Sequence, residues 1–245
     1  MSGNGHSKSA INRAGDLLAG RTGGTPTPEE ILAAYEVVDW YRASHTIPLT
    51  TANMGLRSVM KTEGCNTRRA TQRLKRMNTI IDKLRRYPRM DLARMQDIAG
   101  ARAVLESLDE VRRVQKRYMA NSLQRNGKAD KVKDYVTNPK DTGYRSIHLH
   151  TSYHQVRIEV QLRTPLQHEW AIMIEVATGI TGIDLKSGLG PDELLDAYRH
   201  AAAGMALEEV GVTPDESFMA EFTRLTTRAQ QWLIADRASQ EGTSR

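Results

Sequence analysis

Residues 133–171 read KDYVTNPKDTGYRSIHLHTSYHQVRIEVQLRTPLQHEWA, and they contain two runs in which apolar and polar residues alternate. Such alternation is typical of strands that bury one face and keep the other polar. In the run 156–163, the apolar positions are Val156, Ile158, Val160 and Leu162. In the run 144–151 they are Ile147 and Leu149, and the opposite face carries Tyr144, Ser146, His148 and His150. Two consecutive runs of this kind predict a hairpin.

The register of this hairpin is restricted, because both apolar sets must face the core. We expect two apolar cross-strand pairs, Leu149 with Ile158 and Ile147 with Val160. The same register gives two polar pairs, His148 with Glu159 and Ser146 with Gln161. A polar face that combines a carboxylate, an imidazole, an amide and several arginines is unusual for a sheet that is merely solvated. It predicts a functional site.

The composition is that of an ordinary globular protein, since 39% of the 245 residues are hydrophobic and 26% are charged. A chain of this length forms one large domain or two small ones. The sequence has no run of about 18 apolar residues that could span a membrane. Its N-terminal residues lack an apolar signal core, so export is not expected. The one cysteine, Cys65, excludes an internal disulfide and a cysteine-based zinc cluster, is expected to be structural, and fits a cytoplasmic location.

The charge is unevenly distributed along the chain. Residues 57–89 hold eleven Lys or Arg against Glu63 and Asp82, a net charge of +9. Residues 175–245 hold six Lys or Arg against twelve Asp or Glu, a net charge of −6. A basic block of this density indicates either a solvated helix face or a site for a polyanion such as ATP phosphates, nucleic acid or an acidic partner.

The order of the expected elements indicates an α+β fold. A capping threonine, a proline and two acids at residues 27–30 predict a helix over 28–44. Pro48 is expected to interrupt the chain before the next helix. Further helices are expected over 50–62, 108–125, 165–177, 191–210 and 214–238, and strands over 98–105 and 133–135. Residues 1–28 are rich in Gly, Ser and Thr and are expected to be flexible, apart from a short helix over 9–18.

The segment 68–91 has two interpretations. Its apolar residues fit one long amphipathic helix, with Ala70, Leu74, Met77, Ile81 and Leu84 along one face. Alternatively, Thr71, Arg73 and Lys75 alternate on a short strand, and Asn78 caps a helix over 79–86. The residue pattern leaves both interpretations open, and Pro88 ends the segment in either case.

Five motifs follow one another along the chain. They are Arg73-Leu-Lys75 with Thr79-Ile-Ile-Asp-Lys83-Leu84, Asp97-Ile-Ala-Gly100-Ala-Arg102, Lys133-Asp-Tyr135, Pro139-Lys140 with Gly143-Tyr144-Arg145-Ser146-Ile-His148, and Glu159-Val-Gln161-Leu-Arg163-Thr164 with His168-Glu-Trp170-Ala. In order and spacing these motifs resemble the synthetase domain of the RelA/SpoT family, the alarmone pyrophosphokinases. The resemblance covers roughly residues 40–180.

The resemblance implies a mixed β-sheet of the nucleotidyltransferase type, flanked by helices, with a short strand carrying Arg73 and Lys75. It places a pyrophosphokinase domain at residues 29–180 and makes residues 181–245 an acidic helical extension of that domain. Long members of the family also have a hydrolase module with an adjacent His-Asp pair. No His in this sequence is followed by Asp, so the resemblance implies a synthetase-only member.

The resemblance also implies the chemistry, which is transfer of the β,γ-diphosphate of ATP to a ribose 3′-hydroxyl. Asp97 is expected to hold Mg²⁺ at the triphosphate, because a hard cation prefers carboxylate oxygen. Glu159 is expected to be the general base on the 3′-hydroxyl or a further metal contact. Four cations are expected to clamp the ATP phosphates, namely Arg73, Lys75, Lys83 and Arg102.

The loop 139–148 is expected to receive the acceptor. Tyr144 can stack on its base, Lys133, Lys140 and Arg145 can reach its phosphates, and His148 and Gln161 can orient its ribose or base. Arg163 is assigned to the same group. A buried structural role is the alternative for His148, and His168 and Trp170 are expected to pack within a helix.

The acceptor is expected to be the 3′ CCA end of tRNA, with GDP, GTP or an adenine nucleotide as alternatives. The sequence has Pro139-Lys140-Asp141-Thr142-Gly143 where the family commonly has P-K-P-N-G, and Asp141 adds a negative charge near the acceptor phosphates. The segment 40–49 looks like that of toxin-type actinobacterial and phage members, which implies an antitoxin protein as a partner. A nucleotide-sensing binding module without catalysis is the non-enzymatic alternative. The acidic tail is expected to cover the basic block, to dock an antitoxin, or only to solubilise the protein.

Overall fold

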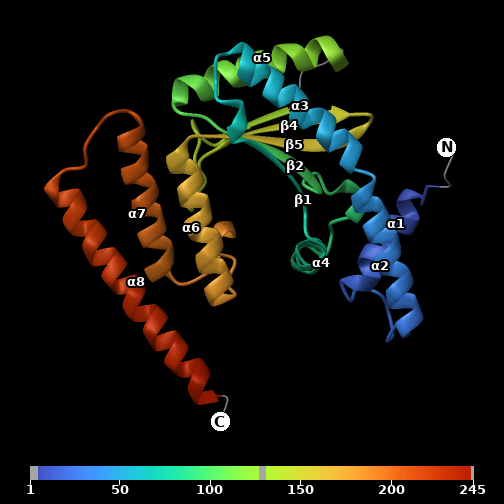
Figure 1. The fold of residues 1–245 in the computed structure, drawn as a ribbon. Coiled ribbons are helices and arrows are strands. Elements are labelled where there is room, and N and C mark those ends of the chain that lie inside the picture. The colour runs from blue at the N-terminus through green and yellow to red at the C-terminus, as the bar shows by residue number, and fades with distance from the viewer. Residues whose placement is uncertain (1–4, 127–130, 244–245) are drawn as a thin grey trace. The chain divides into compact units, whose positions relative to one another are not determined.

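The computed structural model describes residues 5–126 and 131–243 (Figure 1). The helices are α1 (Lys8–Leu18), α2 (Pro28–Ala43), α3 (Thr46–Thr62), α4 (Met77–Arg86), α5 (Leu108–Asn126), α6 (Pro165–Thr181), α7 (Asp192–Glu209) and α8 (Glu216–Thr243). The strands are β1 (Ala70–Leu74), β2 (Ala99–Val104), β3 (Lys131–Asp134), β4 (Ile147–Tyr153) and β5 (Val156–Arg163). Three short 3₁₀ turns are η1 (Thr67–Arg69), η2 (Leu92–Arg94) and η3 (Leu185–Ser187). The expected α+β fold is confirmed.

The strands form one sheet in the order β1-β2-β5-β4-β3. β1 and β2 are antiparallel. β2 and β5 run the same way, because Gly100 lies beside Glu159 while, further along both strands, the Leu105 N–H donates to the Arg163 carbonyl. The sheet is therefore mixed, as expected.

The chain divides into two compact units, which we describe separately. Unit 1 comprises Met1–Ala103, Lys116–Val132 and Leu149–Gln161, and unit 2 comprises Val104–Gln115, Lys133–His148 and Leu162–Arg245. Among the helices of the described residues, none is long and apolar enough to cross a membrane.

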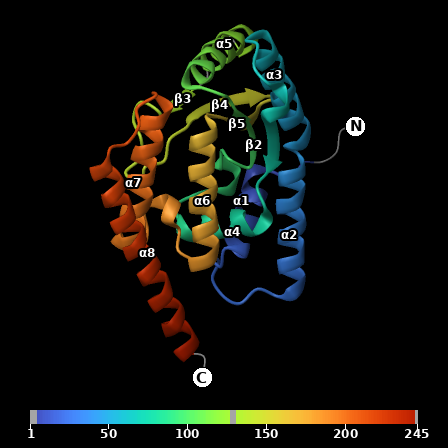
Figure 2. The same ribbon diagram turned by 60° about the vertical axis from the view of Figure 1, so that its left-hand side comes forward.

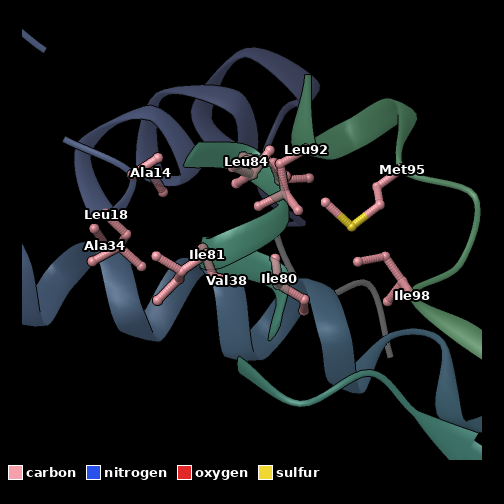
Figure 3. Close-up of a cluster of buried hydrophobic side chains, with 12 residues drawn as sticks. Ala14, Leu18, Ala34, Val38, Ile80, Ile81, Leu84, Leu92, Met95 and Ile98 are labelled. Carbon is pink, nitrogen blue, oxygen red and sulfur yellow. The ribbon is translucent and has the colours of Figure 1, made fainter. Parts of the chain in front are cut away.

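The core of unit 1 gathers around α4 (Figure 3). Ile80, Ile81 and Leu84 on one face of α4 are buried against α1, α2 and the segment 92–98. Residues 1–28 are expected to be flexible, but α1 within them buries Ile11, Ala14 and Leu18 in this cluster. Its short apolar face therefore makes α1 a part of the core rather than of a linker.

The N-terminal helices begin as their capping residues dictate, with one exception. The Thr27 side chain and Glu30 form a capping box at the start of α2, which confirms the predicted start. Pro48 does not interrupt the chain before the next helix, however, because α3 already begins at Thr46. Proline is tolerated there, since the N–H groups of a first helical turn have no intrahelical partner.

The segment 68–91 forms a strand and a helix, as the resemblance implies. β1 is followed by α4, and the long amphipathic helix is therefore wrong. The helix begins at Met77, two residues before the predicted start, since its N-cap is Arg76 rather than Asn78. Met77, Ile81 and Leu84, which belong to the apolar stripe of the proposed long helix, all lie on α4.

The predicted hairpin exists, but its register differs from the expected one. A two-residue turn at His154 and Gln155 joins β4 to β5, and both residues have positive φ angles, 49° and 64°. Such a turn pairs the residues that flank it, Tyr153 with Val156. His150 then faces Glu159, so the expected pairing of His148 with Glu159 is wrong by two residues. A shift of two keeps every side chain on its predicted face, and the burial of β4 and β5 alternates as expected.

The core of unit 2 joins the loop 139–146 to the helices that follow β5. Tyr144, Trp170 and Ile174 are buried together with Leu185, Leu194 and Leu195 from the C-terminal segment. α7 and α8 lie side by side in both views (Figure 1, Figure 2). The C-terminal helices are therefore part of the core around the predicted acceptor loop.

Candidate functional site

The pairing of β1 with β2 places two predicted ATP contacts on one face of the sheet in unit 1. Arg73 lies opposite Gly100 and Thr71 lies opposite Arg102. The other face of β2 consists of Ala99, Ala101 and Ala103, which are all buried. Because Gly100 has no side chain, the face that carries Arg73 and Arg102 is open at that point. Such an opening beside two arginines suits a bound phosphate chain.

Asp97 lies between two lysines at the start of β2. The Lys75 Nζ donates to Asp97 Oδ2 at 2.9 Å, and the Lys83 Nζ donates to both carboxylate oxygens at 2.8 Å. The Asp97 side chain is 26% exposed and the lysines are 14% and 24% exposed, so the group is half-buried and solvent still reaches it. Of these three predicted site residues, Lys75 directly follows β1, Lys83 lies on α4 and Asp97 lies two residues before β2, and the structure brings them together.

The elements around this cluster hold its side chains in place. Lys75 follows β1, its N–H donates to the Ile98 carbonyl at 2.8 Å, and its carbonyl accepts from Arg42 Nε at 2.9 Å. Lys83 lies one residue before Leu84, whose burial fixes that face of α4. Asp97 lies next to Ile98, which is fully buried. The backbone that carries Lys75, Lys83 and Asp97 is therefore fixed by hydrogen bonds and by buried neighbours.

The electrostatics keep Asp97 ionised. Burial alone would raise the pKa of its carboxyl, but Lys75 and Lys83 outweigh burial and lower this pKa to about 2. Burial lowers the pKa of Lys75, against the raising effect of Asp97. At neutral pH Asp97 is thus a carboxylate that can bind a hard cation, and the Lys75 and Lys83 side chains beside it can donate to phosphate oxygens.

The second predicted carboxylate, Glu159, is half-buried on the polar face of β5 together with Gln161. β5 lies beside β2, since a Cβ placed on Gly100 would lie 3.5 Å from the Glu159 carbonyl oxygen. His150 of β4 faces Glu159 across the hairpin. Glu159 and Asp97 therefore belong to the same unit, Glu159 on β5 and Asp97 two residues before the neighbouring strand β2.

All of the predicted acceptor residues except Gln161 lie in unit 2, and their exposure differs. Lys133 and Lys140 are exposed. Tyr144 is only 1% exposed, and its hydroxyl bonds to His148 Nε2 at 2.6 Å and accepts from Arg163 Nη2 at 2.7 Å. Arg163 is 2% exposed and also reaches the Ser146 hydroxyl, at 3.4 Å. The structure brings Tyr144, His148 and Arg163 together in one hydrogen-bonded network in which Tyr144 and Arg163 are buried, so base stacking on Tyr144 requires its ring to be uncovered.

Arg145, also a predicted acceptor contact, is paired within the protein. Its Nη1 binds the Glu209 carboxylate at the end of α7, and the Thr164 hydroxyl binds the same carboxylate. The Arg145 side chain is 12% exposed and that of Glu209 is 3% exposed. Sequence analysis did not single out Glu209, since nothing in its own segment distinguishes it from the other acids of the tail.

Two other site features have structural roles. Asp134 of the Lys133-Asp-Tyr135 motif accepts from the backbone N–H groups of Val136 and Thr137 at 3.0 Å and pairs with Arg112 at 2.5 Å, which fixes the turn after β3. Trp170 is buried and its indole N–H donates to the Tyr198 carbonyl at 2.9 Å, so its expected packing role is confirmed.

Replacing Tyr144 with Phe is expected to lower the free energy of unfolding by about 2 kcal/mol, because the buried Arg163 guanidinium loses an acceptor. Chemical denaturation would measure the change. Tyr87→Phe, at a residue that is 45% exposed, is the control and should be neutral. Equal stability of the Tyr144→Phe variant and the wild type would contradict the network.

Replacing Gly143 with Ala is expected to cost about 2–3 kcal/mol of unfolding free energy. Gly143 has φ +87°, and a Cβ there would lie 2.6 Å from the Ala202 Cβ of α7. The control Gly182→Ala, at φ +70° with nothing within 4 Å, carries only the backbone strain and should cost about 1 kcal/mol. Denaturation measures both changes. Equal losses of unfolding free energy in the two variants would show that Ala202 of α7 does not restrict the side chain at position 143.

Known proteins resemble the part of the chain that contains these residues. Residues 72–177 match the family described as the region found in RelA / SpoT proteins. Uncharacterized protein Rv1366 of Mycobacterium tuberculosis is 32% identical over 155 residues, which are 60% of this chain and 52% of that protein. GTP pyrophosphokinase YjbM of Bacillus subtilis is 32% identical over 111 residues, 41% of this chain and 51% of that one. The chain thus spans about half the length of these relatives.

Solved structures share the fold. Small alarmone synthetase 1 from Bacillus subtilis, bound to its product pppGpp, has a TM-score of 0.55 and 22% identity, and the match covers 70% of this chain and 93% of that one. A GTP pyrophosphokinase family protein from Streptococcus pneumoniae has a TM-score of 0.52 and 20% identity, covering 79% and 98%. The fold is that of the small alarmone synthetases. Residues 72–177, which match the region found in RelA / SpoT proteins, lie within this fold.

Proposed function

We propose that this protein is an ATP-dependent pyrophosphokinase, which transfers the β,γ-diphosphate of ATP to the 3′-hydroxyl of a ribose. The observation that carries the proposal is the ionised Asp97 between Lys75 and Lys83, next to the open face at Gly100. The RelA/SpoT region and the name of the Bacillus subtilis relative support it.

The cations of unit 1 account for binding of the diphosphate donor. Lys75 and Lys83 bind Asp97, and the same ammonium groups can turn to phosphate oxygens when ATP arrives. Arg73 and Arg102, on the open face of β1 and β2, add planar donors. These cations neutralise the charge that develops on the transferred phosphates and fix the position of the donor.

A magnesium ion is part of the proposal, and the residues fit it. Mg²⁺ is usually held by one or two carboxylates together with substrate phosphates, so a dense cluster of protein ligands is not required. Among the described residues, no group of three or more His, Cys, Asp or Glu could hold a metal. Asp97 is ionised and half-buried with solvent access, and Glu159 is half-buried on β5, so these two would hold the ion. The bound cation would withdraw negative charge from the phosphates.

Glu159 is proposed as the general base on the acceptor hydroxyl. Its polar neighbours on the same face are Gln161 on β5 and His150 across the hairpin. A carboxylate removes a proton in the transition state when it lies within hydrogen-bond reach of the hydroxyl. Gln161 can orient the ribose by hydrogen bonding, since its amide both donates and accepts.

We assign the 3′ CCA end of tRNA as the acceptor and a translation-inhibiting toxin, neutralised by an antitoxin protein, as the biological role. The exposed Lys133 and Lys140 can contact an RNA backbone, and the net charge of +9 over residues 57–89 favours a polyanion. The acids Asp141 and Glu209 in and beside the loop disfavour the terminal phosphates of a free nucleotide. GDP or GTP is the second candidate, favoured by the name of the Bacillus subtilis relative.

The acceptor is tested by incubating the protein with ATP labelled at the γ-phosphate and Mg²⁺, and with GDP, GTP, ATP or deacylated tRNA in separate reactions. Label in tRNA alone is expected. Label in a guanine or adenine nucleotide would overturn the tRNA assignment, and no label in any acceptor would favour a nucleotide-binding module. Periodate-oxidised tRNA, whose terminal ribose lacks the 3′-hydroxyl, is the matched control and should stay unlabelled.

A further inference from the structure

α7 packs against the acceptor loop, residues 139–148. Ala202 lies so close to Gly143 that a Cβ on this glycine would meet the Ala202 Cβ at 2.6 Å. One turn earlier, Arg199 Nε donates to the Asp141 carbonyl at 2.9 Å. The space left between the loop, α6 and α7 is a cavity of about 10 Å³, which is lined by Gly143 and Ala202 and has room for about one water molecule. The helix is therefore packed directly against the loop.

At its last residue, α7 presents a carboxylate to the loop. Glu209 binds both the guanidinium of Arg145 and the hydroxyl of Thr164, and its side chain is 3% exposed. Separating such a buried pair is costly, because it leaves a charge without water or a partner. An anion that needs Arg145 must therefore compete with Glu209.

The position of Glu209 has a consequence for the acceptor. A nucleoside di- or triphosphate concentrates several negative charges at one end, and a carboxylate beside them repels these charges. The 3′ end of an RNA brings a single charge at each phosphodiester, and the exposed Lys133 and Lys140 can meet it without Arg145. Asp141, exposed on the same loop, adds to the repulsion of a terminal phosphate group.

We infer that Glu209 is a specificity-determining positioning residue, which occupies the anion position at Arg145 and thereby excludes free nucleoside di- and triphosphates from the acceptor loop. The inference rests on the proposed function for the location of the acceptor. It deepens that proposal by naming the residue that selects a nucleic-acid 3′ end over a free nucleotide.

The test measures direct binding of GDP and GTP to the full chain in the absence of ATP, at one fixed ionic strength. Glu209→Gln removes the charge with little change of shape and is expected to bind both nucleotides about tenfold more tightly than the wild type. Glu208→Gln, at the exposed neighbouring residue, is the matched control and should bind as the wild type does. Unchanged or weaker binding by a folded Glu209→Gln variant would overturn the inference.

A second variant covers a failure of Glu209→Gln to fold. Glu209→Asp keeps the charge but withdraws the carboxylate from Arg145 by one methylene, and a gain of about threefold in affinity is expected. No gain in this variant would overturn the inference. The binding titrations of both variants are independent of catalysis. An absence of diphosphate transfer to any acceptor would therefore contradict the proposed function, and the titrations would still test the role of Glu209.

Two further measurements distinguish a role of Glu209 in acceptor selection from a merely structural role. If Glu209 acts through Arg145, adding Arg145→Gln to Glu209→Gln should remove the gain in nucleotide affinity. With ATP present, the effect of Glu209→Gln should fall on the KM for GDP or GTP more than on kcat. A gain that persists in the double variant, or an effect on kcat alone, would contradict the assignment.

Discussion

Replacing Asp97 with Asn is expected to reduce diphosphate transfer by on the order of 10³-fold, because the reaction loses the carboxylate that would hold the metal and position both lysines. Measuring AMP release and acceptor labelling would show the loss. Asp82→Asn on the same helix as Lys83 is the matched control, since the Asp82 side chain is 59% exposed, and it should keep wild-type activity. Full activity in the Asp97→Asn variant would remove Asp97 from the site.

The same substitution has an effect on stability that depends on pH. The Asp97 pKa is about 2 in the folded protein against an ordinary value of 3.8, so the ionised group contributes roughly 2 kcal/mol of stability. Because the folded pKa is the lower one, this contribution is present above about pH 4 and is lost as the pH falls through about 2. Unfolding titrations between pH 5 and 2 should show this loss in the wild type and not in Asp97→Asn. If the unfolding free energies of the wild type and Asp97→Asn changed with pH in parallel, Lys75 and Lys83 would not stabilise the ionised Asp97.

Replacing Glu159 with Gln is expected to lower kcat by about 10²–10⁴-fold, the usual contribution of a general base. ATP binding should persist, because the lysines and arginines that hold the phosphates are unchanged. The control is Arg157→Gln, two residues earlier on the same face of β5 and exposed, which should leave kcat unchanged. A Glu159→Gln variant with wild-type kcat would show that another group takes the proton, and loss of ATP binding would make Glu159 a ligand of the donor instead.

The alternation of residues along β4 and β5 predicted the hairpin and the polar face, because a strand exposes every second side chain. Its register was wrong, since the turn is made by His154 and Gln155 in left-handed conformation, and this pair lacks the Asn-Gly or Asp-Gly signature of such turns. The segment 68–91 could not be decided from its pattern, because Ala70 and Leu74 of β1 happen to continue the helical spacing of Met77, Ile81 and Leu84 of α4. The motif resemblance decided it correctly.

The candidate site was predicted in part. The convergence of Lys75, Lys83 and Asp97 followed from the motifs, and the structure confirms that they touch. The burial of Tyr144 and the pairing of Arg145 did not follow, because both depend on the C-terminal helices, and Glu209 reaches Arg145 across 64 residues of sequence. Contacts of that range leave no local pattern, so charge alone suggested only that the acidic tail covers something basic.

The proposed reaction moves a diphosphate, and not a single phosphate, from ATP to the acceptor. The most direct measurement uses ATP labelled separately at the β- and γ-phosphates, with tRNA as acceptor, and counts the nucleotide released for each label transferred. The account predicts one AMP for each acceptor modified, with both labels in the acceptor. Release of ADP with only the γ label transferred would contradict it.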